Sequence, residues 1–257
     1  MPSTNIHGRE IYFEIHGNGD PIVLLHHGFG CTKMWQDIYP PLVNNGYQVI
    51  MYDRRGYGKS DAGNDFKKLY VSDTFRAESV TELDHLINFL SITSFHLIGQ
   101  CEGGVIAIDY AVQFPERVKT VITSSTLCYS KVPMSDFNAV KFPHPFQELE
   151  PKLKEKLISW HGEDHAEPFF NQFRKYGGAY GKNIFDLRKS LTKVSCPSLV
   201  LYPDRSFLFE VEQGVDFYRH LAAGELAVLP KCGHNTYEHQ PQEYVHHVLN
   251  FLKRHHY

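Results

Sequence analysis

The sequence predicts a doubly wound α/β fold, in which a mostly parallel sheet carries helices on both faces. Two patterns indicate it: continuous Val/Ile/Leu-rich runs, typical of strands buried on both faces, and helical-period stretches that alternate with them. The predicted strands are residues 10–15, 21–25, 48–52, 94–98, 120–124, 198–202 and 225–229. The predicted helices are residues 34–44, 72–90, 102–113, 210–222 and 242–253. Antiparallel pairing is expected only in a first hairpin, around residues 17–20.

The alternation of strands and helices stops in the middle of the chain. Apolar residues recur there at helical spacing, at Leu149, Leu153 and Leu157 and then at Phe169, Phe170 and Phe173. A third short helix is expected near residues 185–191. Three helices without a strand between them exceed what one crossover needs, which favours a helical lid over ordinary helices that cover the sheet. We therefore expect a core of residues 1–127 and 193–257 and a lid of residues 128–192.

Composition and charge exclude several classes of function. The chain has 257 residues, 42% hydrophobic and 21% charged, which indicates a globular protein rather than a disordered one. Its 26 basic and 29 acidic residues include no basic block, so nucleic acid is not an expected partner. No apolar run approaches the ~20 residues of a membrane span. Because the five cysteines contain no Cys-x-x-Cys pair and no export signal is visible, we expect a cytoplasmic protein with free thiols.

The most informative motif is a tight turn between a predicted strand and a predicted helix. Residues 99–104 read Gly-x-Cys-x-Gly-Gly, with Cys101 at the centre. Such a turn strains the central residue and leaves no room for side chains beside it, which explains Gly99, Gly103 and Gly104. The motif resembles the nucleophile elbow of the α/β-hydrolase fold, with Cys101 in place of the usual serine. A cysteine at this position is similar to the elbow of dienelactone hydrolases.

Three further motifs extend this resemblance, in the family's order. Residues 24–30 resemble the His-Gly oxyanion loop, which implies that the backbone N–H groups of Phe29 and Glu102 form an oxyanion hole. Residues 53–60 resemble the Asp-x-Arg-Gly-x-Gly-x-Ser turn that borders the site. Residues 229–234 resemble the loop that carries the catalytic histidine, here His234. Together the motifs imply an eight-strand-type sheet and the lid-bearing esterase and lactonase branch of the family.

The departure from the family concerns the third member of the triad. In the turn after the strand at residues 198–202, Asp204 falls on the first acidic position and Ser206 on the position of the catalytic carboxylate. The other place where the fold supplies this acid, after residues 120–124, offers only hydroxyl groups. We therefore expect the second ring nitrogen of His234 to be held by Ser206 or by Asp204.

A cysteine depends less than a serine on the missing carboxylate. In a serine enzyme that carboxylate is worth ~10⁴ in rate, whereas a thiol has a pKa of only ~8.5, which a helix N-terminus and an imidazolium lower further. We therefore expect Cys101 and His234 to form a thiolate–imidazolium pair. Glu102 opposes this pair with a negative charge, unless its carboxylate turns toward the helix N-terminus.

The leading hypothesis is a hydrolase of a carboxylic ester, lactone or thioester that works through an acyl-cysteine. Cys101 attacks, the amides of Phe29 and Glu102 hold the oxyanion, and His234 carries the proton. The expected partner is a small acyl substrate in an apolar pocket, and this chemistry requires no cofactor. The candidate substrate-binding residues are His27, Gly28, Trp160 and Phe170.

Four alternatives stay open. An acyltransferase or cyclase would resolve the same acyl-cysteine with a nucleophile other than water. A non-catalytic member would use the pocket only to bind a small molecule. A lyase or isomerase would use His234 as base and Cys101 as acid. A Cys/His metal site is the weakest reading, because no chelating pair shares a helix at i, i+4.

Overall fold

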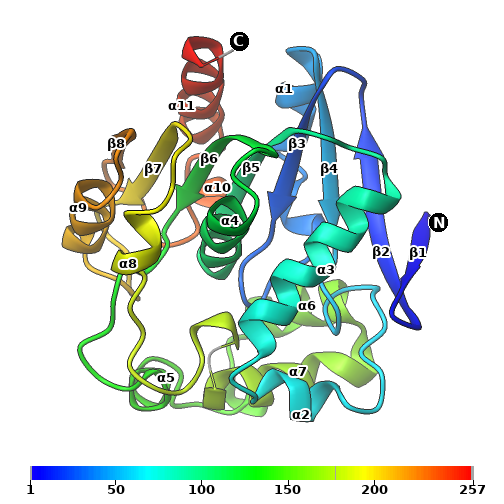
Figure 1. The fold of residues 1–257 in the computed structure, drawn as a ribbon. Helices are drawn as coiled ribbons and strands as arrows, with labels where there is room; N and C mark the ends of the chain where they lie inside the picture. Colours follow the sequence, from blue (N-terminus) through cyan, green and yellow to red (C-terminus); the bar gives the residue numbers. More distant parts are fainter. Residues whose placement is uncertain (1, 177, 256–257) are drawn as a thin grey trace.

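A computed structural model describes residues 2–176 and 178–255 and contains one eight-stranded sheet (Figure 1). The strands are β1 (Ser3–Ile6), β2 (Arg9–His16), β3 (Asp20–Leu25), β4 (Tyr47–Tyr52), β5 (Phe95–Gln100), β6 (Val118–Ser124), β7 (Ser198–Pro203) and β8 (Gly224–Leu229). Their order is β1-β2-β4-β3-β5-β6-β7-β8. Only the β1–β2 and β2–β4 pairs are antiparallel. The expected mostly parallel sheet is confirmed.

The prediction of a hairpin around residues 17–20 is wrong. β2 pairs with β4 and β3 lies on the other side of β4, so residues 17–20 cross β4 instead of joining two neighbours. The first hairpin joins β1 to β2 through His7 and Gly8, which both have positive φ angles. β1 was not predicted, because its four residues alternate between exposed and buried at the sheet edge and form no apolar run.

Helices cover both faces of the sheet (Figure 1). One face carries α1 (Tyr39–Asn44), α10 (Thr236–His239) and α11 (Pro241–Arg254), and the other carries α3 (Phe75–Phe89), α4 (Glu102–Gln113) and α9 (Val211–Arg219). The helix predicted at residues 34–44 is instead two pieces, the 3₁₀ helix η1 (Thr32–Trp35) and α1. Pro40 and Pro41 cause the break, because proline lacks the amide hydrogen and fits only in the first turn of a helix.

The two faces of the sheet enclose separate apolar cores. Successive residues of β3 point to opposite faces, so Ile22 and Leu24 pack into one core and Val23 and Leu25 into the other. All four side chains are fully buried. This double burial explains why the central strands read as continuous apolar runs, and it fixes the positions of the loops at the carboxyl ends of β3 and β5.

The chain between β6 and β7 forms helices without a further strand among the described residues. They are α5 (Met134–Lys141), η2 (Phe146–Glu148), α6 (Pro151–His161), α7 (Glu163–Tyr176), η3 (Gly178–Tyr180) and α8 (Arg188–Leu191). With α2 (Phe66–Tyr70), α5, α6 and α7 gather below the carboxyl end of β3 in Figure 1. No helix in the described part of the chain has the length and apolarity to cross a bilayer.

Candidate active site

Cys101 occupies a strained turn between β5 and α4. Its backbone has φ 51° and ψ −112°, a positive φ that only a tight tertiary context imposes on a residue with a side chain. A Cβ atom at Gly103 would overlap the carbonyl oxygen of Leu25, and one at Gly104 would overlap Oγ1 of Thr126. The glycines therefore let α4 start directly against β3, and the backbone turn that the motif predicts is present.

The Cys101 thiol is buried, and burial favours its protonated form. Its Sγ lies 3.6 Å from the Tyr180 hydroxyl, which comes from η3. Burial raises the pKa of the Cys101 thiol to about 12, against a lowering by the hydrogen bond from Tyr180. Among the described residues no hydrogen bond joins Sγ to His234. Desolvation disfavours both charges of the expected thiolate–imidazolium pair, because burial raises the pKa of Cys101 and lowers that of His234.

The thiol opens into a cavity of about 360 Å³ between the sheet and the helices that follow β6. Cys101, Glu102 and His234 lie in its wall together with His27 and Gly28. The apolar part of the lining includes Phe29, Phe142, Leu149, Leu153, Leu157, Trp160, Phe170, Phe173, Phe207 and Leu208. The cavity is therefore lined by all four candidate substrate-binding residues and by two of the four candidate catalytic ones, Cys101 and His234, and its surface suits an apolar group.

The loop after β3 is held by hydrogen bonds from two histidines. The Phe29 N–H donates to Nδ1 of His27 at 3.1 Å, and Nε2 of His27 lies 3.0 Å from the Tyr237 hydroxyl. His161, on α6, donates from Nε2 to the Phe29 carbonyl at 2.8 Å and accepts from the Gly58 N–H at 3.0 Å. The Phe29 amide, which is expected in the oxyanion hole, thus donates its hydrogen bond to His27 in this structure. Through His161, α6 holds the loop after β3 in place.

The charge of Glu102 is balanced by an ion pair with the buried Arg54. Its Oε1 lies 2.5 Å from Nη1 of Arg54, and the two side chains are 1% and 2% exposed. Nη2 of Arg54 also donates to the carbonyl oxygens of His26 and His27 at 3.3 Å. Burial lowers the pKa of Arg54, but attraction to Glu102 and to other neighbouring groups together outweighs burial, so the pKa is raised overall. The sequence left open whether the helix N-terminus would offset the charge of Glu102, and in the structure the carboxylate pairs with Arg54.

His234 is held by Ser206. The Ser206 Oγ lies 3.1 Å from Nδ1 of His234, and burial lowers the pKa of His234 to about 3, so the ring is neutral. Asp204 does not reach the ring: its Oδ1 accepts the Cys232 N–H at 3.0 Å. Backbone hydrogen bonds from Lys231 and Cys232 lower the pKa of Asp204. Asp204 therefore shapes the histidine loop, whereas Ser206 contacts the histidine itself.

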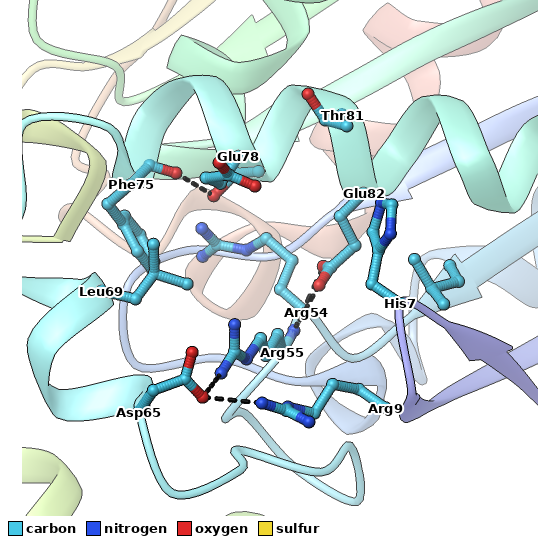
Figure 2. A pocket seen from close by; sticks show the side chains of 12 residues that line it. His7, Arg9, Arg54, Arg55, Asp65, Leu69, Phe75, Glu78, Thr81 and Glu82 are labelled. Atoms are coloured by element: carbon cyan, nitrogen blue, oxygen red, sulfur yellow. Dashed lines mark hydrogen bonds and ion pairs between the residues drawn. The ribbon is translucent and has the colours of Figure 1, made fainter.

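A second cavity, of about 300 Å³, is lined by charged side chains (Figure 2). Asp65 accepts hydrogen bonds from Arg9 and Arg55, and Glu82 accepts the Arg55 N–H at 3.1 Å. Arg54 also belongs to the lining. Arg9, Arg55, Asp65 and Glu82 bind one another, and neither Cys101 nor His234 lines this cavity. The candidate active site is therefore the apolar cavity.

Three residues of the site were not singled out by the sequence. Arg54 lies in a motif that the resemblance assigns only to a structural turn, Tyr180 is one of many aromatic residues of the middle segment, and His161 is one of 16 histidines. Only the spacing of Arg54 from the glycines of its turn offered a signal. The hydrogen-bond partners of the Tyr180 and His161 side chains are more than 50 residues away, at a separation that no local pattern reports.

Comparison with known proteins identifies the family. The model of the α/β hydrolase fold family matches residues 20–175. The chain belongs to this family. A proline iminopeptidase from Lactobacillus crispatus (strain ST1) is 26% identical over 286 residues, with 96% of each chain covered. A 2-hydroxy-6-oxononadienedioate/2-hydroxy-6-oxononatrienedioate hydrolase from Escherichia coli (strain K12) is 24% identical over 269 residues, covering 95% of this chain and 91% of that one.

Solved structures agree on the fold. The enol-lactonase from Burkholderia xenovorans LB400 superimposes with a TM-score of 0.78 at 19% identity and covers 98% of this chain and 100% of its own. At this identity the likeness shows the fold alone. The architecture expected from the four motifs is therefore shared over nearly the whole chain.

Proposed function

We propose that this α/β-hydrolase family member hydrolyses a carboxylic ester, lactone or thioester through an acyl-cysteine on Cys101. The observation that carries the proposal is the Cys101 elbow, which presents a thiol at the end of a strained turn to an apolar cavity that His234 also lines. A buried structural cysteine has no need of a positive φ angle or of three flanking glycines. The relatives named as hydrolases and as an enol-lactonase support this class of reaction.

The proposed reaction has two steps. In the first, the Cys101 proton moves to His234, Sγ bonds to the substrate carbonyl carbon, and the alcohol or thiol leaves with that proton. In the second, water gives a proton to His234 while its oxygen bonds to the acyl carbon. The C–Sγ bond then breaks, the carboxylic acid leaves, and Sγ takes the proton from His234. In each step the oxyanion accepts hydrogen bonds from the N–H groups of Phe29 and Glu102. It replaces His27 as the acceptor of the Phe29 N–H, because a hydrogen bond to an anion is stronger than one to a neutral ring.

The neutral surroundings of His234 favour esters, lactones and thioesters over peptides. The amine of a peptide leaves only after it takes a proton, and the imidazolium that gives this proton must first form, so peptide hydrolysis depends on a stabilised imidazolium. Here the ring contacts the Ser206 hydroxyl and two aromatic rings, and burial disfavours its charged form. Alcohol and thiol leaving groups need less help, so we propose an acyl bond of this kind as the substrate.

Intact-protein mass spectrometry during turnover of p-nitrophenyl esters and an acyl thioester tests the proposal. The wild type is expected to accumulate a covalent acyl adduct on Cys101. Cys101→Ala is expected to lose the adduct and at least about 10³-fold in turnover, the scale of removing a nucleophile. Cys196→Ala, a cysteine outside the cavity, is the matched control and is expected to behave as the wild type. Undiminished turnover in Cys101→Ala would overturn the acyl-cysteine mechanism.

A further inference from the structure

The hydroxyl of Ser206 has three hydrogen-bonding neighbours. Its Oγ lies 3.1 Å from each of three nitrogen atoms, the backbone nitrogens of Leu208 and Phe209 and Nδ1 of His234. The two amides belong to the turn that follows Ser206, so the main chain itself holds the oxygen in place. The arrangement determines which atom donates in the third contact.

A hydroxyl has one hydrogen to donate and two lone pairs to accept with. The amides of Leu208 and Phe209 act only as donors, so they occupy both lone pairs. The hydroxyl hydrogen is then directed to Nδ1 of His234, which accepts it. A neutral imidazole that accepts at Nδ1 carries its own hydrogen on Nε2, the ring nitrogen that Ser206 does not contact, and His234 lines the cavity.

A carboxylate in this position would have the opposite effect. It only accepts hydrogen bonds, so it would take the two amides and also a hydrogen from Nδ1, and Nε2 would be left with a lone pair to act as a base. We propose that Ser206 is a positioning residue that holds His234 with its hydrogen on Nε2, so that the resting site offers Cys101 no base. This inference rests on the proposed function, because it concerns the activation of the same thiol.

Neighbouring groups hold His234 in place, so the property that Ser206 controls is the tautomer of its ring. The His234 carbonyl accepts hydrogen bonds from the Gln100 side chain at 3.0 Å and from the Ser125 hydroxyl at 2.7 Å. Phe207 and Phe209 pack edge-on against the ring at centroid distances of 5.9 and 5.4 Å. The titratable groups that act on the ring are His239 and His27. Neither supplies a carboxylate that would reverse the tautomer.

The arrangement makes Cys101 slow to react without making it inert. For Nε2 to become a base, the hydrogen must move to Nδ1, and Ser206 must then release one amide in order to accept it. Losing one hydrogen bond changes an equilibrium by about 5- to 100-fold, so the base form of His234 is a minor population. In the resting form the Nε2 hydrogen is placed to hydrogen-bond an oxygen or sulfur atom of a bound substrate.

Proton-detected ¹⁵N NMR of the His234 ring is the direct test. The wild type is expected to carry its hydrogen on Nε2, and Ser206→Asp is expected to move it to Nδ1. Asp204→Asn is the matched control, because Asp204 lies in the same turn but contacts Cys232 instead of the ring, so it is expected to leave the tautomer unchanged. A hydrogen on Nδ1 in the wild type overturns the inference, whether or not any variant folds.

The second readout is the rate of Cys101 alkylation by iodoacetamide against pH, with the labelled position read by peptide mass spectrometry. Ser206→Asp is expected to raise the rate at neutral pH by about 5- to 100-fold and to lower the apparent pKa of the thiol. An unchanged rate in a folded Ser206→Asp variant contradicts the inference. Failure of the proposed function is distinguished from this result, because it would appear as turnover that persists in Cys101→Ala.

Discussion

The two walls of the active site handle buried polarity in opposite ways. On the elbow side, Glu102 and Arg54 bury full charges and pair them at 2.5 Å. On the histidine side, His234 and Ser206 are neutral and are joined by one hydrogen bond. Separating a buried ion pair is costly, because it leaves an uncompensated charge. A neutral pair is held by a single hydrogen bond, whose direction depends on which of the two groups carries the hydrogen. The elbow wall is therefore the rigid one, and the histidine wall sets the reactivity.

The comparison also explains how Cys101 tolerates a neighbouring acid. The charge of Glu102 raises the pKa of the Cys101 thiol, and that of Arg54 lowers it. Because the arginine also binds the carbonyl oxygens of His26 and His27, it joins the elbow to the oxyanion loop. The Arg54–Glu102 pair thus connects the Cys101 elbow to the loop after β3, and the proposed mechanism needs both to supply the oxyanion hole.

Breaking the ion pair from one side gives the largest expected effect. Arg54→Met leaves Glu102 as an unpaired buried carboxylate and is expected to lower the free energy of unfolding by about 3–5 kcal/mol. Urea denaturation measures this loss. The double variant Arg54→Met with Glu102→Gln removes both charges and is expected to recover most of the stability. A loss below about 1 kcal/mol in the single variant would mean that the elbow wall does not depend on its charges.

Substitutions at Gly103 and Gly104 test whether the backbone of the elbow wall needs glycine at these positions. Gly103→Ala is expected to cost about 1–3 kcal/mol of unfolding free energy, because its Cβ overlaps the Leu25 carbonyl, which is main chain and cannot rotate away. Gly104→Ala overlaps only the Thr126 side chain. Adding Thr126→Ala is therefore expected to recover part of the cost of Gly104→Ala but none of the cost of Gly103→Ala. Equal recovery in both double variants would refute a backbone origin for the elbow constraint.

The same contrast separates what the sequence could predict from what it could not. The turn at Cys101 was predictable, because Gly99, Gly103 and Gly104 record contacts that exclude every larger side chain. The sheet was predictable because strands buried on both faces leave unbroken apolar runs. The edge strand β1 and the break before Pro40 were missed, since the first is too short for a pattern and the second interrupts a continuous helical period.

The electrostatics of the site lay beyond sequence reasoning. The sequence identified Ser206 and Asp204 as the candidates to hold His234, and the geometry gives that contact to Ser206. The direction of that hydrogen bond depends on the backbone amides of Leu208 and Phe209, and every residue type except proline carries such an amide. Likewise, the protonated state of Cys101 follows from burial by distant segments, which a thiol's usual pKa does not reveal.

The expected effect at His161, which holds the loop after β3, depends on pH. Burial lowers the pKa of His161 to about 4, below the ~6.5 of an unfolded chain, so the unfolded state binds more protons at acidic pH. The stability that neutral His161 contributes is therefore complete above about pH 6.5 and is lost as the pH falls toward about 4. His161→Gln is expected to reduce the fall in unfolding free energy by up to about 1.4 kcal/mol per pH unit, as measured by urea denaturation. His246→Gln, on an exposed part of α11, is the control, and an equal change in both variants would show that burial of His161 is not the cause.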